Sequence, residues 1–299
     1  LFDSVRGFGA SGKVLYSNST DAEGTNALID SVSSTGFTIK ASSDNTGTLV
    51  DWCWKAGTAF TNDASATGIG SIDSSGSVST DAGFSIVSYT GSGANATIAH
   101  GLGSAPRMMI FKNRDEGAEG WFVYHESIGN TKKLLLDETG AATTSSTFFQ
   151  DTSPTSSIIT LGSNHGCNGP DAMICYAFAE KQGYSKFGSY TGNGNADGSY
   201  IHLGFSASLI ITKRTDGSDW WGMFDAKRLG HNGTYSPYPL FANTSDAEVT
   251  DSKLIDFTAN GFKIKSSNGA INASGGSYIF AAFALNPFTT STEIPTTAR

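Results

Sequence analysis

The amino-acid sequence predicts an all-β protein made of tandem antiparallel β-sandwich repeats of the jelly-roll or concanavalin-like kind. Glycine provides 36 of the 299 residues and charged residues only 15%, yet 38% of the residues are hydrophobic. Such a chain has enough apolar side chains for a core and many turns. Short apolar or alternating runs are separated by turn signals roughly every 8–12 residues, which is typical of sandwiches and barrels. Motifs also return at a step of about 100 residues, and no long segment has the 3.6-residue period of a helix.

Residues 1–57 are interpreted as the back half of a unit, because their motifs return near the end of the chain. Leu1-Phe2-Asp3 with Arg6 matches Met223-Phe224-Asp225 with Arg228. The segment from Asn18 to Glu23 matches the segment from Asn243 to Glu248, and Gly36-Phe37 matches Gly261-Phe262. The half unit closes with Trp52-Cys53-Trp54, whose counterparts are Tyr176-Ala177-Phe178 and Ala281-Ala282-Phe283.

The closing segment of this half unit alternates strongly. Val50, Trp52 and Trp54 fall on one face of a strand, which predicts a central core strand. We expect Trp54 and its counterparts Phe178 and Phe283 to be buried. A half unit alone exposes an apolar face, so residues 1–57 are expected to pair with missing upstream sequence, with another unit or with another chain.

The remaining segments follow from composition and from the repeat. Residues 58–82 are rich in Gly, Ser, Thr and Asp with little apolar content, which predicts a linker. Residues 83–181 and 183–288 are predicted to be complete β-sandwich units. Residues 289–299 form a Thr-rich tail, which is expected to fray.

The front half of the unit occurs twice. Gly83-Phe84-Ser85 followed by Ser88-Tyr89-Thr90-Gly91 returns as Gly183-Tyr184-Ser185 followed by Ser189-Tyr190-Thr191-Gly192. The apolar run that ends at Lys112 matches the run that ends at Lys213, and Trp121 matches Trp221. Since the two tryptophans share one repeat position, we expect Trp221 to be a core residue.

Charge and hydropathy exclude several classes of protein. The formal net charge is −8, which gives no electrostatic footprint for nucleic acid or for an anionic membrane. No stretch approaches the ~20 apolar residues of a membrane span. The sequence begins at Leu1 without a methionine, so we expect a processed piece or a fragment of a longer protein.

As a set, the motifs resemble a known but uncharacterised repeat. They are Ser-Tyr-Thr-Gly, an apolar strand that ends in Lys-x-Arg, Phe-Asp-x-x-Arg, Ala-Glu-x-Thr, Gly-Phe-x-Ile and the closing Trp-x-Trp-Lys-Ala or Ala-Phe-Ala. This combination is similar to a repeat that is abundant in virion and tail-fibre proteins of marine tailed phages. The resemblance implies a virion structural or host-attachment role and an oligomer, commonly a trimer. It brings no catalytic residues.

Two loops imitate ligand-binding motifs. The segment from Gly7 to Lys13 resembles a phosphate-binding loop but is followed by Val14 instead of Ser or Thr, so a plain loop is predicted. The segment from Asn193 to Gly198 has the alternating oxygen ligands of a calcium loop but lacks the closing glutamate, and we expect a hairpin turn. No cofactor and no metal site are predicted.

Cysteines and histidines form no recognisable site. Cys53, Cys167 and Cys175 are odd in number and lack metal spacing, which predicts buried structural thiols. His100 and His202 occupy matching positions in the repeat, which favours a shared structural hydrogen bond over catalysis. The acidic residues near one another in sequence fall in turns.

An aromatic loop is the one candidate contact with sugar. Tyr235 and Tyr238 lie in the turn-rich sequence Tyr-Ser-Pro-Tyr-Pro and have no counterparts in the preceding unit. They are therefore free to be exposed, and exposed aromatic rings can stack on sugar rings.

We therefore predict a virion structural protein, a segment of a phage tail fibre or another appendage that takes part in host attachment. A carbohydrate-binding module of a secreted protein is the alternative, and a glycan depolymerase is the third possibility. The chain is not expected to be an enzyme. Its expected partners are other virion proteins, further copies of itself and a host surface glycan or protein receptor, and its expected location is the virion. Neither nucleic-acid binding nor a membrane span is expected.

Overall fold

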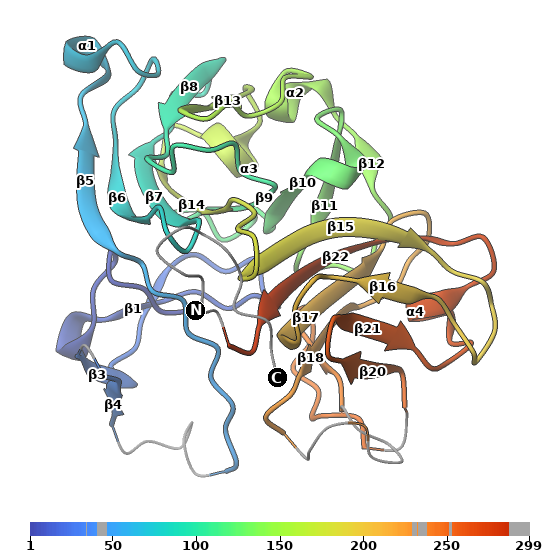
Figure 1. Cartoon of the computed structure of the whole chain (residues 1–299). Coiled ribbons are helices and arrows are strands. Elements are labelled where there is room, and N and C mark those ends of the chain that lie inside the picture. The colour runs from blue at the N-terminus through green and yellow to red at the C-terminus, as the bar shows by residue number, and fades with distance from the viewer. Residues whose placement is uncertain (34, 41–46, 229–231, 233–237, 251–252, 287–299) are drawn as a thin grey trace.

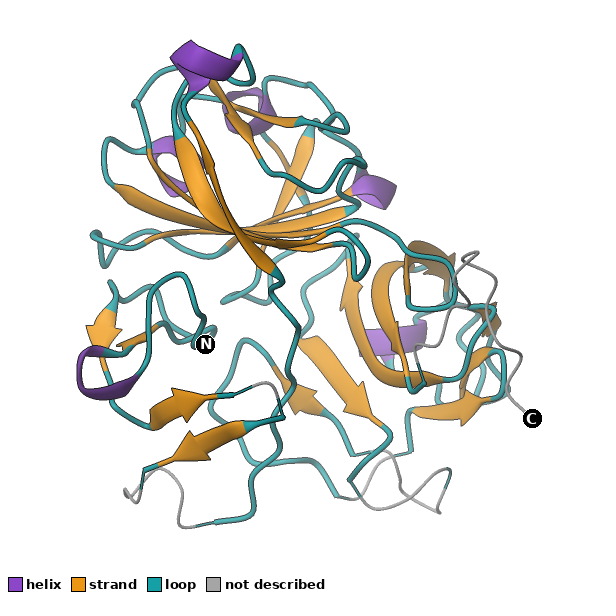
Figure 2. Ribbon diagram, turned by 60° about the vertical axis from the view of Figure 1, so that its left-hand side comes forward, coloured by secondary structure: helices purple, strands orange, loops and turns teal. Residues whose placement is uncertain are grey.

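The computed structural model describes residues 1–33, 35–40, 47–228, 232, 238–250 and 253–286. These residues form short strands in antiparallel sheets and a few helices of one turn (Figures 1 and 2). The all-β prediction is confirmed. No helix in the described part of the chain is long and apolar enough to cross a membrane.

The largest sheet has eight strands in the order β12-β11-β10-β9-β14-β7-β6-β5. Its members are β5 (Thr58–Asn62), β6 (Ser74–Ser79), β7 (Phe84–Thr90), β9 (Met108–Asn113), β10 (Phe122–His125), β11 (Lys132–Leu135), β12 (Thr143–Thr144) and β14 (Ala172–Phe178). A two-stranded sheet of β8 (Ala96–Ala99) and β13 (Ile158–Leu161) packs on it together with α2 (Ser146–Phe149) and α3 (His165–Asn168). Both sheets contribute side chains to one core, among them Val87 and Phe111 from the large sheet and Ile98 and Leu161 from the small one.

The C-terminal part of the chain contains a five-stranded sheet, β15-β22-β17-β18-β19, and a three-stranded sheet, β16-β21-β20. The strands are β15 (Ser185–Thr191), β16 (Tyr200–His202), β17 (Ala207–Arg214), β18 (Trp221–Asp225), β19 (Leu240–Phe241), β20 (Ile255–Thr258), β21 (Gly261–Ile264) and β22 (Ser277–Ala284), with α4 at Gly269–Asn272. Ile210 and Phe280 from the first sheet and Ile201 and Phe262 from the second share a second core.

The N-terminal residues form only short pieces of sheet. They are β1 (Lys13–Val14) paired with β2 (Gly24–Thr25), and β3 (Ile29–Val32) paired with β4 (Phe37–Ile39). A third core joins this region to the rest of the chain and contains Leu15, Trp121 and Trp221. The N-terminal residues therefore pack against both of the larger parts, as Figure 1 shows in blue.

Three aromatic side chains from matching sequence positions meet in that third core. The ring centroids of Trp54 and Phe178 are 6.0 Å apart, those of Trp54 and Phe283 5.3 Å, and those of Phe178 and Phe283 5.9 Å. Phe178 and Phe283 are buried as expected, whereas Trp54 is only partly buried.

Residues 58–82 are not a linker, in contrast to the sequence prediction. They form β5, α1 (Ala64–Thr67) and β6, and β6 pairs with β7 over five residues. Ser and Gly suit this position because the strand lies close to its neighbour: a Cβ on Gly76 would come within 1.8 Å of the Ile86 carbonyl oxygen. Backbone pairing holds the strand without large apolar side chains, so composition alone was misleading. The predicted tail, residues 289–299, lies outside the described residues.

The segment around Trp52 is also different from its prediction. Residues 50–54 belong to no strand, Trp52 and Trp54 are half-buried, and Cys53 is exposed. The matching segments β14 and β22 are each flanked by two strands, β7 and β9 for β14 and β15 and β17 for β22. The described residues offer no such pair of strands to residues 50–54, so the alternating pattern is present but its partners are not.

Candidate functional site

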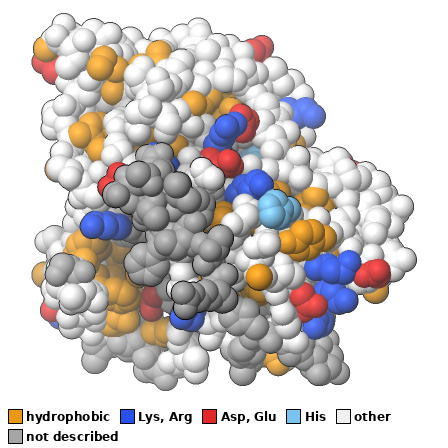
Figure 3. All heavy atoms as spheres, viewed as in Figure 1, with side chains coloured by type: hydrophobic (Ala, Val, Ile, Leu, Met, Phe, Trp, Pro, Cys, Tyr) orange, Lys and Arg blue, Asp and Glu red, His pale blue; other side chains and the backbone are white. Residues whose placement is uncertain are grey.

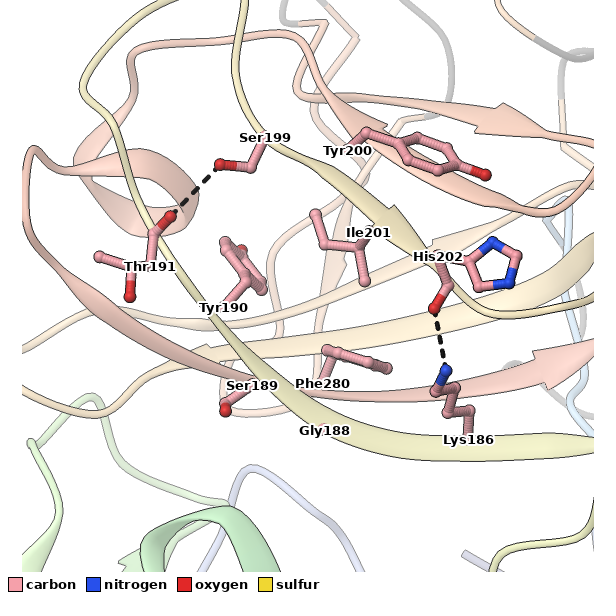
Figure 4. Close-up of a pocket in the computed structure, with 10 residues that line it drawn as sticks. All are labelled: Lys186, Gly188, Ser189, Tyr190, Thr191, Ser199, Tyr200, Ile201, His202 and Phe280. Carbon is pink, nitrogen blue, oxygen red and sulfur yellow. Dashed lines mark hydrogen bonds between the residues drawn. The ribbon is translucent and has the colours of Figure 1, made fainter.

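An open groove separates the two sheets of the C-terminal part, between the edge strands β15 and β16 (Figure 4). Its volume is about 350 Å³. Its walls come from two strands that are neighbours in sequence, and its floor comes from β22. The lining residues are Lys186, Gly188, Ser189, Tyr190, Thr191, Ser199, Tyr200, Ile201, His202 and Phe280.

The groove exists because no described strand covers the outer edge of β15. The matching strand in the preceding part of the chain, β7, has its edge covered. There, β6 pairs with β7, and residues just before it bind β8: the backbone N–H groups of Ser71 and Ile72 both donate to the Thr97 carbonyl. The Ser74 hydroxyl also donates to the Ala99 carbonyl at 3.0 Å. Residues 58–82 thus close the gap between β7 and β8. No described strand covers β15 in the same way.

Tyr200 and His202 form the exposed wall of the groove. Tyr200 is 48% exposed, and its ring centroid lies 6.5 Å from that of His202. The strand alternates, so that Ile201 between them is buried and pairs with Phe262. On the opposite wall the Lys186 ammonium donates to the His202 carbonyl at 3.0 Å, which ties β15 to β16 at one end of the groove (Figure 4).

The deeper part of the groove is aromatic and rigid. The Tyr190 ring stacks on Tyr278 with centroids 4.9 Å apart and an interplanar angle of 9°. The Tyr190 hydroxyl donates to the Ile271 carbonyl at 3.0 Å, and burial raises the pKa of Tyr190 well above its usual value, so that it stays neutral. Gly188 leaves room for Phe280, because a Cβ at this position would lie 2.8 Å from the Phe280 ring.

The groove brings together side chains of several chemical kinds. It combines an exposed tyrosine ring, an imidazole, an ammonium group and the hydroxyl of Ser199, and Figure 3 shows basic, histidine and hydrophobic side chains side by side on this face. Such a mixture of stacking and hydrogen-bonding groups suits a polyhydroxylated ligand. Its lining residues include no carboxylate, whereas glycosidic hydrolysis uses a pair of them in most enzymes.

The predicted tyrosine loop does not contribute to this groove. Tyr235 lies outside the described residues. Tyr238 is half-buried and is not a lining residue, and its carbonyl accepts a hydrogen bond from Arg228 Nη2 at 2.8 Å. Tyr200 was missed because it begins a strand of three residues that carries no motif. The sequence feature that could have identified Tyr200 is the alternation of Tyr200, Ile201 and His202, in which the aliphatic residue lies between two side chains with polar groups.

The two matched histidines have different environments. His100 is fully buried; its Nδ1 accepts from the Leu102 N–H, and its Nε2 lies 3.2 Å from the Thr155 carbonyl oxygen. Burial lowers the pKa of His100. His202 is exposed in the groove instead. The structural hydrogen bond expected at both positions is therefore described for His100 alone.

The other imitated motifs are structural turns. In the segment from Gly7 to Lys13, which resembles a phosphate-binding loop, residues 9–11 form a short 3₁₀ turn and Lys13 belongs to β1. In the segment from Asn193 to Gly198, which resembles a calcium loop, the side chains of Asn193 and Asn195 each accept a hydrogen bond from the backbone N–H two residues further on. Asp197 forms an ion pair with Lys263 at 2.9 Å. Local hydrogen bonds thus occupy these polar groups.

One cluster of potential metal ligands lies at the surface. Single ligand atoms of Glu116, Glu119 and His165 lie within 4.8 Å of one another, and His165 Nδ1 is 3.9 Å from a Glu116 carboxylate oxygen. His165 is exposed and the two glutamates are half-buried. We assign no metal to this cluster, because acidic groups often gather at a protein surface without one.

The cysteine prediction is correct for two residues of three. Cys167 and Cys175 are fully buried, and burial raises the pKa of the Cys167 thiol to about 12. Cys53 is exposed. The reason is that the segment around Cys53 lacks the flanking strands that bury the matching Ala177 and Ala282.

Comparison with known proteins gives a family but no function. No curated protein and no solved structure matches the chain. The profile of one family, a domain of unknown function (DUF7483), matches residues 1–287. Since the match covers nearly the whole sequence, the chain belongs to the DUF7483 family.

Proposed function

We propose that the chain is a non-catalytic attachment module of an extracellular assembly, a segment of a phage tail fibre or similar virion appendage. In this proposal it contacts a host surface glycan through the groove between β15 and β16. The observation that carries the proposal is the exposed Tyr200 ring beside His202 in an open groove of about 350 Å³. The virion context rests on the resemblance of the sequence motifs to tail-fibre repeats.

A tandem sandwich repeat is the architecture we propose for this role. Matched residues make matched contacts: Trp121 Nε1 donates to the Tyr16 carbonyl, and Trp221 Nε1 donates to the Leu135 carbonyl, both at 2.8 Å. Lys112 and Lys213 follow the same pattern. Lys112 Nζ donates to the Thr20 carbonyl at 2.9 Å, and Lys213 Nζ donates to the Thr139 carbonyl at 2.9 Å.

A recurring ion-pair corner supports the same interpretation. Asp3, Arg6 and Glu23 form one corner, with Arg6 bonded to both carboxylates. The second corner consists of Asp225, Arg228 and Glu248. In both corners the aspartate also accepts the backbone N–H of the arginine. Each corner lies within one unit, so its recurrence supports a repeated unit.

Weak binding at one groove is compatible with attachment. A fibre presents many copies, and linked sites raise the overall avidity far above the affinity of one site. We therefore expect modest affinity for the single chain and firm binding for an assembled multimer, with a trimer as the state implied by the resemblance.

A glycan array tests the attachment function. We expect the chain, displayed at high density, to bind a subset of surface glycans, and Tyr200→Ala to reduce that binding at least tenfold. Tyr16→Ala is the matched control, because its side chain is 50% exposed and lies outside the groove. A reducing-sugar release assay on the bound glycans should stay at background. Release at an ordinary enzymatic rate would favour the depolymerase instead.

The alternative is a carbohydrate-binding module of a secreted protein. It would bind glycan through the same groove but would not be part of a virion. Mass spectrometry of purified virions separates the two. Detection of this chain in the particle supports the appendage, and its detection only in the particle-free medium supports the secreted module.

A further inference from the structure

One end of the groove between β15 and β16 differs from the matching place in the preceding part of the chain. In that part, the Ser85 hydroxyl on β7 donates to the His100 carbonyl at 2.7 Å, and both residues are fully buried. In the groove, the Lys186 ammonium on β15 makes the same contact with the His202 carbonyl at 3.0 Å. A neutral hydroxyl and a charged ammonium thus bind equivalent carbonyls.

Strand pairing fixes this match for the serine and the lysine. Ser85 lies opposite Ala177 on β14, and Lys186 lies opposite Ala282 on β22, with no bulge between the strands in either case. Each alanine is followed in its strand by one of the two phenylalanines that contact Trp54. The serine and the lysine therefore occupy equivalent positions in their sheets.

The two histidines are equivalent for the same reason. The residue before each of them lies in a strand pair, and these pairs are Ala99 with Ile158 and Ile201 with Phe262. The partner strands, β13 and β21, each lead into a helix of one turn whose N-terminus is capped by an asparagine side chain. The histidines differ only in their surroundings, because the first is buried and the second is exposed in the groove.

The lysine adds a positive charge that the hydrogen bond to the carbonyl does not require. An ammonium group has three donor hydrogens, so two remain for a ligand. Two acidic side chains of adjoining segments are bound by other groups. Glu126 pairs with Arg107, and the Glu180 carboxylate accepts the Phe187 N–H at 3.1 Å. Lys186 takes part in none of the ion pairs found among the described residues.

The two ends of the groove therefore differ in charge (Figure 4). Lys186 and His202 lie at one end, and the exposed Tyr200 ring lies beside the imidazole. At the other end the Ser199 hydroxyl donates to the Thr191 carbonyl at 3.4 Å, and this contact is neutral. A ligand with one acid group would place that group at the lysine end.

We propose that the groove selects anionic glycans and holds the acid group of one sugar residue at Lys186 and His202, beside a sugar ring stacked on Tyr200. This inference rests on the proposed attachment function and adds the class of glycan. The ammonium would donate to a carboxylate or sulfate oxygen, and such charge-assisted hydrogen bonds are stronger than neutral ones. The lining residues include no carboxylate that would repel the acid group.

An array on which acidic glycans are printed beside their methyl esters tests this selection, with trigalacturonic acid and its ester as the defined pair. The ester keeps the sugar chain but loses the charge. We expect the chain, displayed at high density, to bind the acid about tenfold better than the ester, the difference expected for one charge-assisted hydrogen bond. Sulfated galactotriose beside galactotriose is the second pair. A preference for the acidic member of either pair supports the proposal and tells which acid group is bound.

Three variants locate the charge that is responsible. Lys186→Gln can still donate to the His202 carbonyl but is neutral, so it should lower binding of the acid to the level of the ester and leave binding of the ester unchanged. Lys186→Arg keeps the charge and should keep the preference. Lys132→Gln is the matched control, because Lys132 is exposed on β11 outside the groove, and it should have no effect.

The outcomes separate the selection from the attachment function. Equal binding of acidic and neutral glycans that Tyr200→Ala abolishes would overturn the selection and leave the attachment function standing. A preference for the acid that Lys132→Gln weakens as much as Lys186→Gln would also overturn the selection, because a general attraction to the surface would then explain it. A chain that binds no glycan on the array would overturn both.

Discussion

His125 should lower the folding stability of the protein at acidic pH. Its ring is buried: Nδ1 accepts the Ser127 N–H at 3.2 Å, and Nε2 lies 3.1 Å from the Phe280 carbonyl oxygen. Since the backbone N–H of Ser127 can only donate, Nδ1 is unprotonated and Nε2 carries the hydrogen that it donates to the Phe280 carbonyl. A proton on Nδ1 would point at the hydrogen of the Ser127 N–H and break this hydrogen bond. Burial is the largest cause that lowers the pKa of His125 from 6.5 to about 4.

The sign and size of the effect follow from this pKa. Above pH 6.5 the imidazole is neutral in the folded and the unfolded chain, and it has no effect on the pH dependence of stability. Below pH 6.5 the unfolded chain takes up the proton first, so stability is lost as the pH falls toward 4. The full loss is about 3 kcal/mol, from 2.5 pKa units at 1.36 kcal/mol each. At pH 4.5 most of this loss, about 2 to 3 kcal/mol, has already occurred.

Urea denaturation at pH 7.5 and pH 4.5 measures this loss, with His125→Gln as the reference. A glutamine can still donate to the Phe280 carbonyl but does not titrate, so it removes the contribution of the imidazole alone. The wild-type chain should lose about 2 to 3 kcal/mol more than the variant between the two pH values. Equal losses would refute the assignment of a buried neutral imidazole.

Three further predictions concern the cores and the ion pairs. Phe283→Ala should lower the free energy of unfolding by about 3–5 kcal/mol because it leaves a cavity between Trp54 and Phe178, and an unchanged denaturation midpoint would contradict the assigned contact. Asp225→Asn should cost about 2 kcal/mol in the same assay, because Arg228 loses the nearer of its two carboxylate partners and keeps Glu248; a loss below about 0.5 kcal/mol would show that the corner contributes little. In native protein one thiol, Cys53, should react with a disulfide reagent, and all three should react after unfolding; three fast thiols in native protein would contradict the burial of Cys167 and Cys175.

The class of fold could be predicted because turn spacing and alternation are local properties of the sequence. The matched tryptophans were also informative, since Trp121 and Trp221 are both buried. Residues 58–82 could not be predicted from apolar content, because β6 is held by backbone pairing and close approach at Gly76. The signal that was available is the spacing of the units: a long segment precedes Gly83, and almost none precedes Gly183.

The candidate site depends on that same difference. A groove between β15 and β16 arises from the absence of a covering strand among the described residues, and no motif marks such an absence. Tyr238 carried a motif-like signal, yet its backbone is bound by Arg228, which the sequence had matched to Arg6 without assigning it a partner. The state of residues 50–54 likewise depends on flanking strands and cannot be deduced from their own alternation.

Hydrogen–deuterium exchange with a glycan identified on the array tests the attachment proposal most directly. The full chain is compared with and without the glycan, and protection is mapped along the backbone. We expect slower exchange in residues 186–191 and 199–202, the two walls of the groove, and no such change in Tyr200→Ala. Protection confined to residues 235–249 would return the site to the tyrosine loop and contradict the groove.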